Sequence, residues 1–201
     1  MSDSPMDAAA ATVEHEKQLD QFRNYLRFLA ETQLDRRLRR RIDPSDIVQE
    51  TMLKAFAAWS SFRGENDCQR AAWLRQILLR VVLHAVRAER CAKRDVAREQ
   101  RLDQLLDQSS QRIEGWLAAD ETSPSMAVQE AEELLQIADA VYQLPEAERI
   151  AIMGFYWQGA SLAEISEEIG RSAPAAAGLV HRGLQRLRTQ LTSAAQGATA
   201  L

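Results

Sequence analysis

Apolar residues recur every three or four positions along most of the chain, which is the spacing of one face of a helix. Low numbers of glycine (8) and proline (5), beside many Ala, Leu, Arg and Glu residues, also favour helix over sheet. We therefore expect an all-α fold. The pattern predicts helices over 16–41, 43–59 and 70–101 in the first half, and over 125–144, 146–157, 161–169 and 172–188 in the second.

Two of these helices begin with residues that cap a helix N-terminus. Asp43 precedes Pro44, which suits the first turn of a helix, and Asp46 adds negative charge to that turn. Ser161 and Glu164 have the spacing of a capping box. The apolar side of the 43–59 helix is expected to consist of Ile47, Val48, Met52, Phe56 and Trp59.

The helices on either side of Gly170 form the clearest motif in the sequence. Gly170 supplies the left-handed residue that a tight helix exit requires, so 161–188 has the pattern of a helix-turn-helix. The second helix of that motif lies in the DNA major groove. An ordinary helical hairpin with solvated basic residues is the alternative. The residues expected to face the groove are Arg171, Ser172, Ala175, Ala177, Gly178, His181 and Arg182.

Charge is distributed unevenly behind the net charge of −4. Residues 70–101 carry nine basic and three acidic side chains, whereas residues 102–148 carry eleven acidic and one basic. This distribution fits two polyanion-binding modules joined by an acidic linker. The expected organisation is a flexible N-terminus (1–15), a first helical domain (16–101), the acidic linker (102–128), a second helical domain containing the helix-turn-helix (129–195) and a tail (196–201).

The first domain offers an acidic face and a basic helix. Asp46, Gln49 and Glu50 lie on one side of the 43–59 helix, and from the pattern alone we interpret them as solvated surface rather than a docking face. The basic helix carries cations at spacings that suit contacts to DNA phosphates, although a merely solvated basic face is as good an explanation. These cations are Arg80, Arg87, Arg90, Lys93 and Arg94.

The loop between those two helices, residues 60–69, mixes an aromatic ring, a cation and amide or carboxylate groups. Phe62, Arg63 and Asn66 are the types of residue that can hold an unstacked base of single-stranded nucleic acid. A polar loop with no role in binding explains the same residues equally well, so both interpretations stay open.

Catalytic and cofactor sites find little support in the sequence. The three histidines lie far apart, and there is no Gly-rich phosphate loop or nucleophile elbow. Cys68 and Cys91 are isolated, which favours a reducing compartment. No apolar run has the length of a membrane span, and the acidic N-terminus does not resemble a secretory signal. We expect a cytoplasmic protein without catalytic residues, metal, cofactor or membrane insertion.

Residues 20–98 and 130–191 together resemble a bacterial RNA polymerase sigma factor of the extracytoplasmic-function group. In the first domain, DPSDIVQETMLKAF resembles the polymerase-docking helix of that family, and AAWLRQILLRVVLHAVRAERCAKR resembles its DNA-reading helix. In the second domain, the resemblance to the family's C-terminal domain extends over LPEAERIAIMGFYWQGASLAEISEEIGRSAPAAAGLVHRGLQRLR. Two such motifs in the family's order are more specific than either alone.

The resemblance implies a role for each surface. Asp46, Gln49 and Glu50 would bind the clamp helices of the polymerase β′ subunit, which reverses the interpretation as solvated surface. The loop from Ser60 to Gln69 would capture a flipped base of the promoter's minus-ten element, and the basic helix would hold the adjacent DNA. The helix-turn-helix would bind the minus-thirty-five element and contact the β flap. The acidic linker would run toward the polymerase active-site channel. An anti-sigma protein is a further partner expected from the family, and the free chain would be a monomer.

The second helix of the helix-turn-helix departs from the family's pattern. Ala177, followed by Gly178, stands where relatives tend to carry Lys or another polar residue, and Pro174 and Ala175 also lack hydrogen-bonding side chains. Such residues cannot form bidentate pairs with bases, so upstream recognition would depend on phosphates and DNA shape. Gly154 and Phe155 likewise stand where relatives often have Leu and Arg.

Two other functions fit the same residues. One is a helix-turn-helix regulator that never joins polymerase and binds duplex DNA by itself. The other is a helical adaptor with a degenerate DNA-binding domain, which would have no salt-dependent affinity for DNA.

Overall fold

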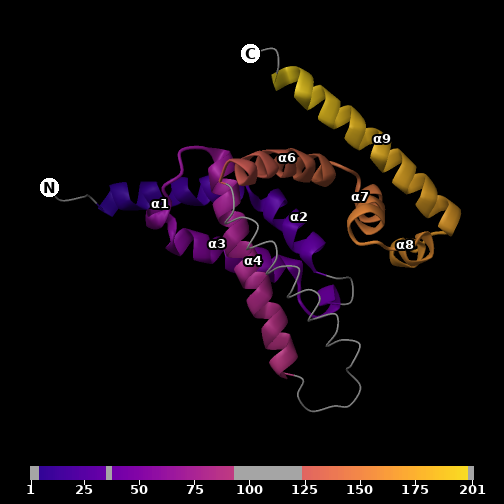
Figure 1. The fold of residues 1–201 in the computed structure, drawn as a ribbon, viewed down its shortest axis with the longest axis horizontal. Coiled ribbons are helices and arrows are strands. Elements are labelled where there is room, and N and C mark those ends of the chain that lie inside the picture. The colour runs from indigo at the N-terminus through magenta and orange to yellow at the C-terminus, as the bar shows by residue number, and fades with distance from the viewer. Residues whose placement is uncertain (1–4, 35–37, 93–123, 199–201) are drawn as a thin grey trace. The chain divides into compact units, whose positions relative to one another are not determined.

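The computed structural model describes residues 5–34, 38–92 and 124–198 of the chain. These residues form helices and turns and contain no strand, which confirms the expected all-α fold (Figure 1). They belong to two compact units, Met1–Glu132 and Glu133–Leu201. Most of the expected acidic linker lies outside the described residues.

In the described part of the first unit, α2, α3 and α4 pack on one another and α1 packs on α3 (Figure 1). The helices are α1 (Pro5–Asp20), α2 (Arg23–Gln33), α3 (Pro44–Ala57) and α4 (Asp67–Ala92), with short 3-10 turns at Leu38–Arg40 and Trp59–Ser61. The largest fully buried side chains of this core include Phe22, Tyr25, Leu26, Phe28, Leu29, Leu74, Leu78 and Leu79.

The helix predicted over 16–41 is divided in the structure, so the prediction of one continuous helix is wrong. α1 ends at Asp20 and α2 begins at Arg23. Phe22 is buried at the junction, and its amide donates a hydrogen bond to the Leu19 carbonyl at 3.0 Å. This turn changes the direction of the chain between two helices that both pack on α3. Because the chain turns over only two residues, the apolar residues keep their helical spacing across the break. The sequence pattern therefore does not reveal it.

Two helices begin earlier than expected. α1 begins at Pro5, in the segment expected to be flexible, where four consecutive alanines favour helix. α4 begins at Asp67 rather than at residue 70, because Asn66 caps it: the Asn66 Oδ1 accepts a hydrogen bond from the Gln69 amide at 2.8 Å. The loop after Trp59 is therefore shorter than the sequence predicts.

The predicted start of α3 is confirmed, but its apolar side is not entirely buried. The Asp43 side chain accepts a hydrogen bond from the Ser45 amide at 2.8 Å, and Pro44 occupies the first turn. Thr51 lies in the core, where its hydroxyl donates to the Ile47 carbonyl. Of the residues expected on the apolar side, Ile47 and Val48 are buried, Met52 and Trp59 are half-buried and Phe56 is exposed.

The second unit is formed by the end of α6 and by the helices that follow it. α7 packs on α8 and α9, and α8 packs on α9. The helix predicted over 146–157 is α-helical only in its first half and finishes as a π-helical turn. These elements are α6 (Pro124–Tyr142), α7 (Glu146–Ile152), the π-helical turn Met153–Trp157, α8 (Leu162–Ile169) and α9 (Ala173–Ala198).

The helix-turn-helix is present as predicted, in α8 and α9. Ser161 and Glu164 form a reciprocal capping box at the start of α8. Gly170 ends α8 in the left-handed conformation, with φ of 68°. Ile165 is fully buried on α8, and α9 buries a stripe that includes Ala176.

Gly183 allows α7 to lie close to α9. A Cβ at this position would lie 2.7 Å from the Ile152 Cγ1 and 3.4 Å from the backbone oxygen of Glu148, both on α7. Because Ile152 is itself fully buried, neither helix has room for the added atom without moving. The absence of a side chain at Gly183 therefore sets the distance between these helices.

Gly183→Ala should destabilise the second unit. Overpacking costs about 1–3 kcal/mol, and the higher helix propensity of Ala returns up to about 1 kcal/mol of that loss. Gly178→Ala is the matched control on the same helix, since its Cβ would meet only the flexible Arg182 side chain. Urea unfolding of the full chain should show lower stability for Gly183→Ala alone. Equal loss in both variants would mean that the α7–α9 distance does not depend on Gly183.

Candidate nucleic-acid and protein interfaces

The acidic face of α3 is accessible. Asp46 and Gln49 are exposed and Glu50 is half-buried, and their spacing places all three on one side of the helix. The Glu50 carboxylate lies 3.0 Å from the Lys54 amino group, one turn further along. Because both partners of this ion pair are about half exposed, the pair is weak and leaves the face open to a partner.

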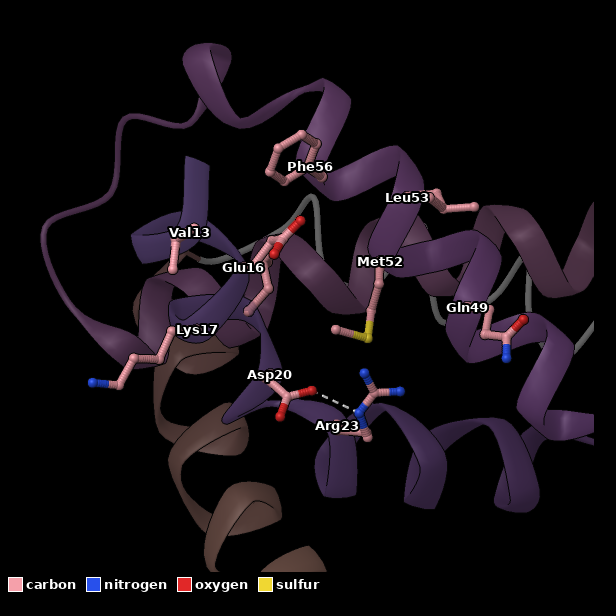
Figure 2. Close-up of a pocket in the computed structure, with 10 residues that line it drawn as sticks. Val13, Glu16, Lys17, Asp20, Arg23, Gln49, Met52, Leu53 and Phe56 are labelled. Atoms are coloured by element: carbon pink, nitrogen blue, oxygen red, sulfur yellow. Dashed lines mark hydrogen bonds and ion pairs between the residues drawn. The ribbon is translucent and has the colours of Figure 1, made fainter. Parts of the chain in front are cut away.

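An open groove of about 780 Å³ lies between α1, α2 and α3, next to the acidic face (Figure 2). Gln49 belongs to both, since it also lines the groove. Three large apolar side chains on its walls, Val13, Leu53 and Phe56, are exposed, and Leu53 is 71% exposed. Exposed apolar groups that gather at one place commonly mark a site of protein interaction. The sequence assigned Phe56 to the apolar side of its helix and did not single out Val13 or Leu53.

The aromatic ring of the 60–69 loop is packed within the first unit. Phe62 lies 5.1 Å from the Trp73 ring and 6.1 Å from the Trp59 ring, measured between centroids. The Arg70 guanidinium lies 5.5 and 5.6 Å from the Trp59 and Phe62 centroids and 5.9 Å from that of Phe22. This arrangement combines aromatic and cation–π contacts. Phe62 therefore anchors the loop, and the sequence missed Arg70 as the cation of this cluster.

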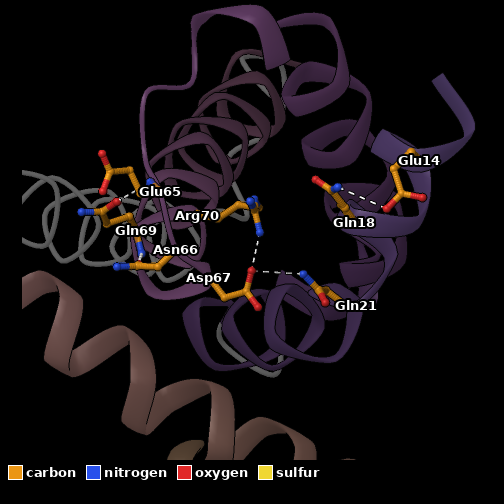
Figure 3. A network of polar contacts seen from close by, with 8 residues as sticks. All are labelled: Glu14, Gln18, Gln21, Glu65, Asn66, Asp67, Gln69 and Arg70. Atoms are coloured by element: carbon orange, nitrogen blue, oxygen red, sulfur yellow. Dashed lines mark hydrogen bonds and ion pairs between the residues drawn. The ribbon is translucent and has the colours of Figure 1, made fainter. Parts of the chain in front are cut away.

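A network of polar contacts fixes the rest of the loop at the start of α4 (Figure 3). Gln69 receives a hydrogen bond from the Glu65 amide at 2.6 Å, while its own amide donates to the Asn66 cap. Asp67 forms an ion pair with Arg70 and accepts a hydrogen bond from the Gln21 side chain of the α1–α2 turn. The side-chain nitrogen of Asn66, Nδ2, takes part in none of these contacts. The helix cap therefore uses only the side-chain oxygen and leaves the Nδ2 donor for another partner.

Arg63 and Gly64 complete the loop. Arg63 is exposed, and its guanidinium donates a hydrogen bond to the Ser60 carbonyl at 2.9 Å. A Cβ on Gly64 would collide with the Phe62 ring and lie 2.9 Å from the Gln69 Cβ. The folded-back ring of Phe62 therefore requires glycine at this position.

The basic helix α4 is described only in part. Arg80 and Arg87 are exposed. Arg90 belongs to the helix, but its side chain lies outside the described residues, as do Lys93 and Arg94 entirely. Two of the five residues predicted to contact phosphates are therefore exposed on the first unit.

The helix-turn-helix presents cations beside a surface of small residues. Arg171, Ser172, His181 and Arg182 are exposed, and Ala175, Ala177 and Gly178 are half-buried. Alanine and glycine project little from the helix, so this surface can approach DNA closely. It offers few groups for hydrogen bonds to bases.

A buried carboxylate that the sequence did not single out lies behind this helix. Glu148 of α7 is 5% exposed, and its two oxygens face Arg182 and Arg186 of α9. The Arg186 Nε is 3.1 Å from Oε2 and the Arg182 Nε is 3.8 Å from Oε1. A signal in the sequence that could have identified Glu148 is an acidic residue on the side of α7 that carries the buried residues Ala151 and Ile152.

The π-helical turn before α8 carries an exposed aromatic cluster. Phe155, Tyr156 and Trp157 are all exposed, and their rings form a series of edge contacts with centroid distances of 5.2 and 6.4 Å. Gly154 is buried against Ile165. The aromatic residues therefore project outward because Gly154 occupies the inner position.

Other chemical sites are not apparent in the described part of the chain. Among these residues, no three His, Cys, Asp or Glu side chains gather as metal ligands would. Burial raises the pKa of the half-buried Cys68 thiol, which keeps it in the neutral form. No helix within the described ranges has the length and apolar character needed to cross a membrane.

Two helical units, one with an exposed acidic face and a basic helix and the other with a helix-turn-helix, are typical of a DNA-binding protein. Residues 20–91 match the family model for Sigma-70 region 2, and residues 134–187 match that for Sigma-70, region 4. The two matches together cover more than half of the chain. The chain therefore belongs to the sigma-70 family of RNA polymerase sigma factors, and to its extracytoplasmic-function type.

Membership of this family establishes the general activity. The chain binds core RNA polymerase and promoter DNA, and it directs promoter-specific transcription. Sigma factor families are not enzymes. The region 2 match extends from the end of α1 to the end of α4, and the region 4 match extends from α6 into α9.

The two roles assigned to Asn66, a helix cap and a base contact, can be separated by substitution. Asn66→Ser keeps an oxygen for the Gln69 amide and removes the amide donor, whereas Asn66→Ala removes both. Urea unfolding should show a loss of about 1 kcal/mol for Ala and little change for Ser, since both Asn and Ser are good caps. Promoter melting by the holoenzyme, followed by permanganate reactivity, should fall in both. Normal melting with Asn66→Ser would mean that Asn66 acts only as a cap.

Proposed function

We propose that the first unit docks on the β′ clamp helices of core polymerase and opens the promoter's minus-ten element, while the second unit binds the minus-thirty-five element and contacts the β flap. The observation that supports this assignment best is the accessible face of Asp46, Gln49 and Glu50 on the unit that matches region 2. An acidic surface of this kind suits a basic partner helix.

The groove beside the acidic face extends the proposed docking surface. Polar groups at the rim give orientation and an apolar centre gives affinity, which is the usual division within a protein interface. Leu53 and Phe56 lie on the same helix as Asp46 and Glu50 and within two turns of Glu50, so one partner helix can contact both kinds of group.

The loop after Trp59 is the proposed site of minus-ten recognition. Because Phe62 is packed against Trp73, we assign the base contacts to Arg63 and to the donor side of Asn66, with the Phe62 ring as their support. Arg80 and Arg87 on α4 would hold the adjacent phosphates, and Arg90, Lys93 and Arg94 continue the same proposed contact along the sequence.

The second unit would bind upstream DNA chiefly through its phosphates. Arg171, Ser172 and Arg182 are exposed and carry donors, while His181 is exposed beside them. Ala175, Ala177 and Gly178 would allow close approach to the groove and make sequence preference depend on DNA shape.

Reconstitution tests the proposal as a whole. Core RNA polymerase incubated with the full chain should start transcription from a subset of a random promoter library, and the recovered promoters should share two elements at a fixed spacing. Stable binding of the isolated chain to duplex DNA, with no initiation and no association with core, would instead indicate a helix-turn-helix regulator.

Charge reversal on α3 tests the docking face. Asp46→Arg with Glu50→Arg should abolish binding to core polymerase, measured by size-exclusion chromatography or fluorescence anisotropy, because like charges would then face the basic partner. Glu132→Arg with Glu133→Arg is the control, since it changes the net charge equally at two exposed acids of α6. Circular dichroism should show both variants folded. Unchanged core affinity in the α3 variant would remove the docking assignment.

A further inference from the structure

Glu148 is a buried acidic residue in the unit proposed to bind DNA, a polyanion. A negative charge is unfavourable at such a place unless it has a function. The Glu148 side chain is 7% exposed, and the residue stands on α7 rather than on the helix-turn-helix itself. A carboxylate that loses its water is stable only when it is paired with positive charge. The negative charge of Glu148 would also repel DNA phosphates bound to the same unit. Glu148 therefore costs the unit affinity for DNA unless its contacts supply something in return.

The contacts of Glu148 are with two arginines, one turn apart on α9. Oε2 lies 3.1 Å from the Arg186 Nε, close enough for an ion pair although the geometry is not that of a hydrogen bond. Oε1 lies 3.8 Å from the Arg182 Nε. Each arginine thus faces the carboxylate with its inner nitrogen. The two side chains remain 54% and 58% exposed, so much of each guanidinium stays accessible to a ligand.

The contact between Gly178 and Arg182 shows in which direction the Arg182 side chain extends. A Cβ on Gly178 would lie 3.3 Å from the Arg182 Nη1, so the guanidinium lies back along α9, one turn nearer the start of the helix. The start of α9 is the part that a helix-turn-helix inserts into the groove. Arg182 is therefore held on its inner side by Glu148 while its outer nitrogen reaches toward the DNA-facing surface.

The surroundings of the two arginines suit a phosphate group. They border an open hollow of about 430 Å³ on the second unit. Its lining consists of cations, carboxamides and a hydroxyl, which are donors that phosphate oxygens accept from. The lining residues are Gln143, Arg182, Gln185, Arg186, Thr189 and Gln190. Two arginines and one acid leave this part of the surface with a net positive charge.

We propose that Glu148 is a positioning residue for the upstream DNA contact: it orients the guanidinium groups of Arg182 and Arg186 so that their outer N–H groups donate to backbone phosphates. An arginine that is already oriented loses less side-chain entropy when it binds. This inference rests on the proposed function of the second unit. It also explains how a recognition helix with Ala175 and Ala177 retains a directed contact to DNA.

Glu148→Gln provides the test, because simple electrostatics and positioning predict opposite results. Removing a negative charge should strengthen DNA binding, whereas loss of positioning should weaken it. We expect the affinity of the holoenzyme for a promoter to fall roughly three- to tenfold, which is the size of effect expected when a hydrogen bond from arginine to a charged phosphate is weakened. The slope of log affinity against log salt should decrease in magnitude by up to about one for each phosphate that the arginines no longer bind. A promoter fragment that lacks the upstream duplex should be bound normally.

Glu146→Gln is the matched control, since Glu146 is an exposed acid on the same helix and the change in charge is identical. Its affinity should be unchanged or slightly higher. A higher affinity in Glu148→Gln as well would mean that Glu148 withholds the arginines from DNA, and would overturn the proposal. Wild-type binding that does not depend on the upstream duplex would refute the proposed function of the second unit instead.

A positioning role is distinguished from a purely structural one by combining substitutions. In a background of Arg182→Gln with Arg186→Gln, Glu148→Gln should cause no further loss of affinity, because there is no guanidinium left to orient. A loss that persists in this background would show that Glu148 acts only through the stability of the unit. Arg182→Lys with Arg186→Lys keeps both charges and removes the nitrogens that face Glu148. Wild-type affinity in that variant would also overturn the proposal, even if Glu148→Gln fails to fold.

Discussion

The close approach of α7 to α9 determines the geometry of the second unit. α7 and α8 have 7 and 8 residues, too few to be stable as isolated helices, so their positions come from packing on the longer α9. Gly183 brings α7 close to α9, and Glu148 then reaches the arginines that lie beside this contact. The shape and the charge pattern of the proposed DNA-binding surface therefore depend on Glu148, which lies outside the helix-turn-helix motif, as well as on Gly183 within it.

In the first unit, the same residues support the fold and are assigned to function. Asn66 caps α4, and Phe62 and Arg70 pack with Trp59 in the cluster below the loop. If this loop contacts DNA as proposed, its backbone is already ordered, which lowers the entropy lost on binding. On α3, by contrast, Phe56 is exposed beside the acidic face and lies outside the buried core.

The sequence alone determined the elements whose chemistry is local. The cap at Asp43, the capping box of Ser161 and Glu164 and the left-handed turn at Gly170 all depend on residues within a few positions of one another. The all-α class and the helix-turn-helix follow from the same short-range pattern. The family resemblance also came from contiguous segments, and the matches to regions 2 and 4 confirm it.

Tertiary structure decided the features that join residues distant in the chain. The pairing of Glu148 with Arg186 and the placement of Arg70 among aromatic rings involve separations that no helical period encodes. The break at Phe22 and the exposure of Phe56 have the same origin, since each apolar residue fits the periodic pattern and only packing decides whether it is buried. Periodicity shows which residues share a face of one helix, but which other helix covers that face is determined by the volume and charge of the groups that meet there.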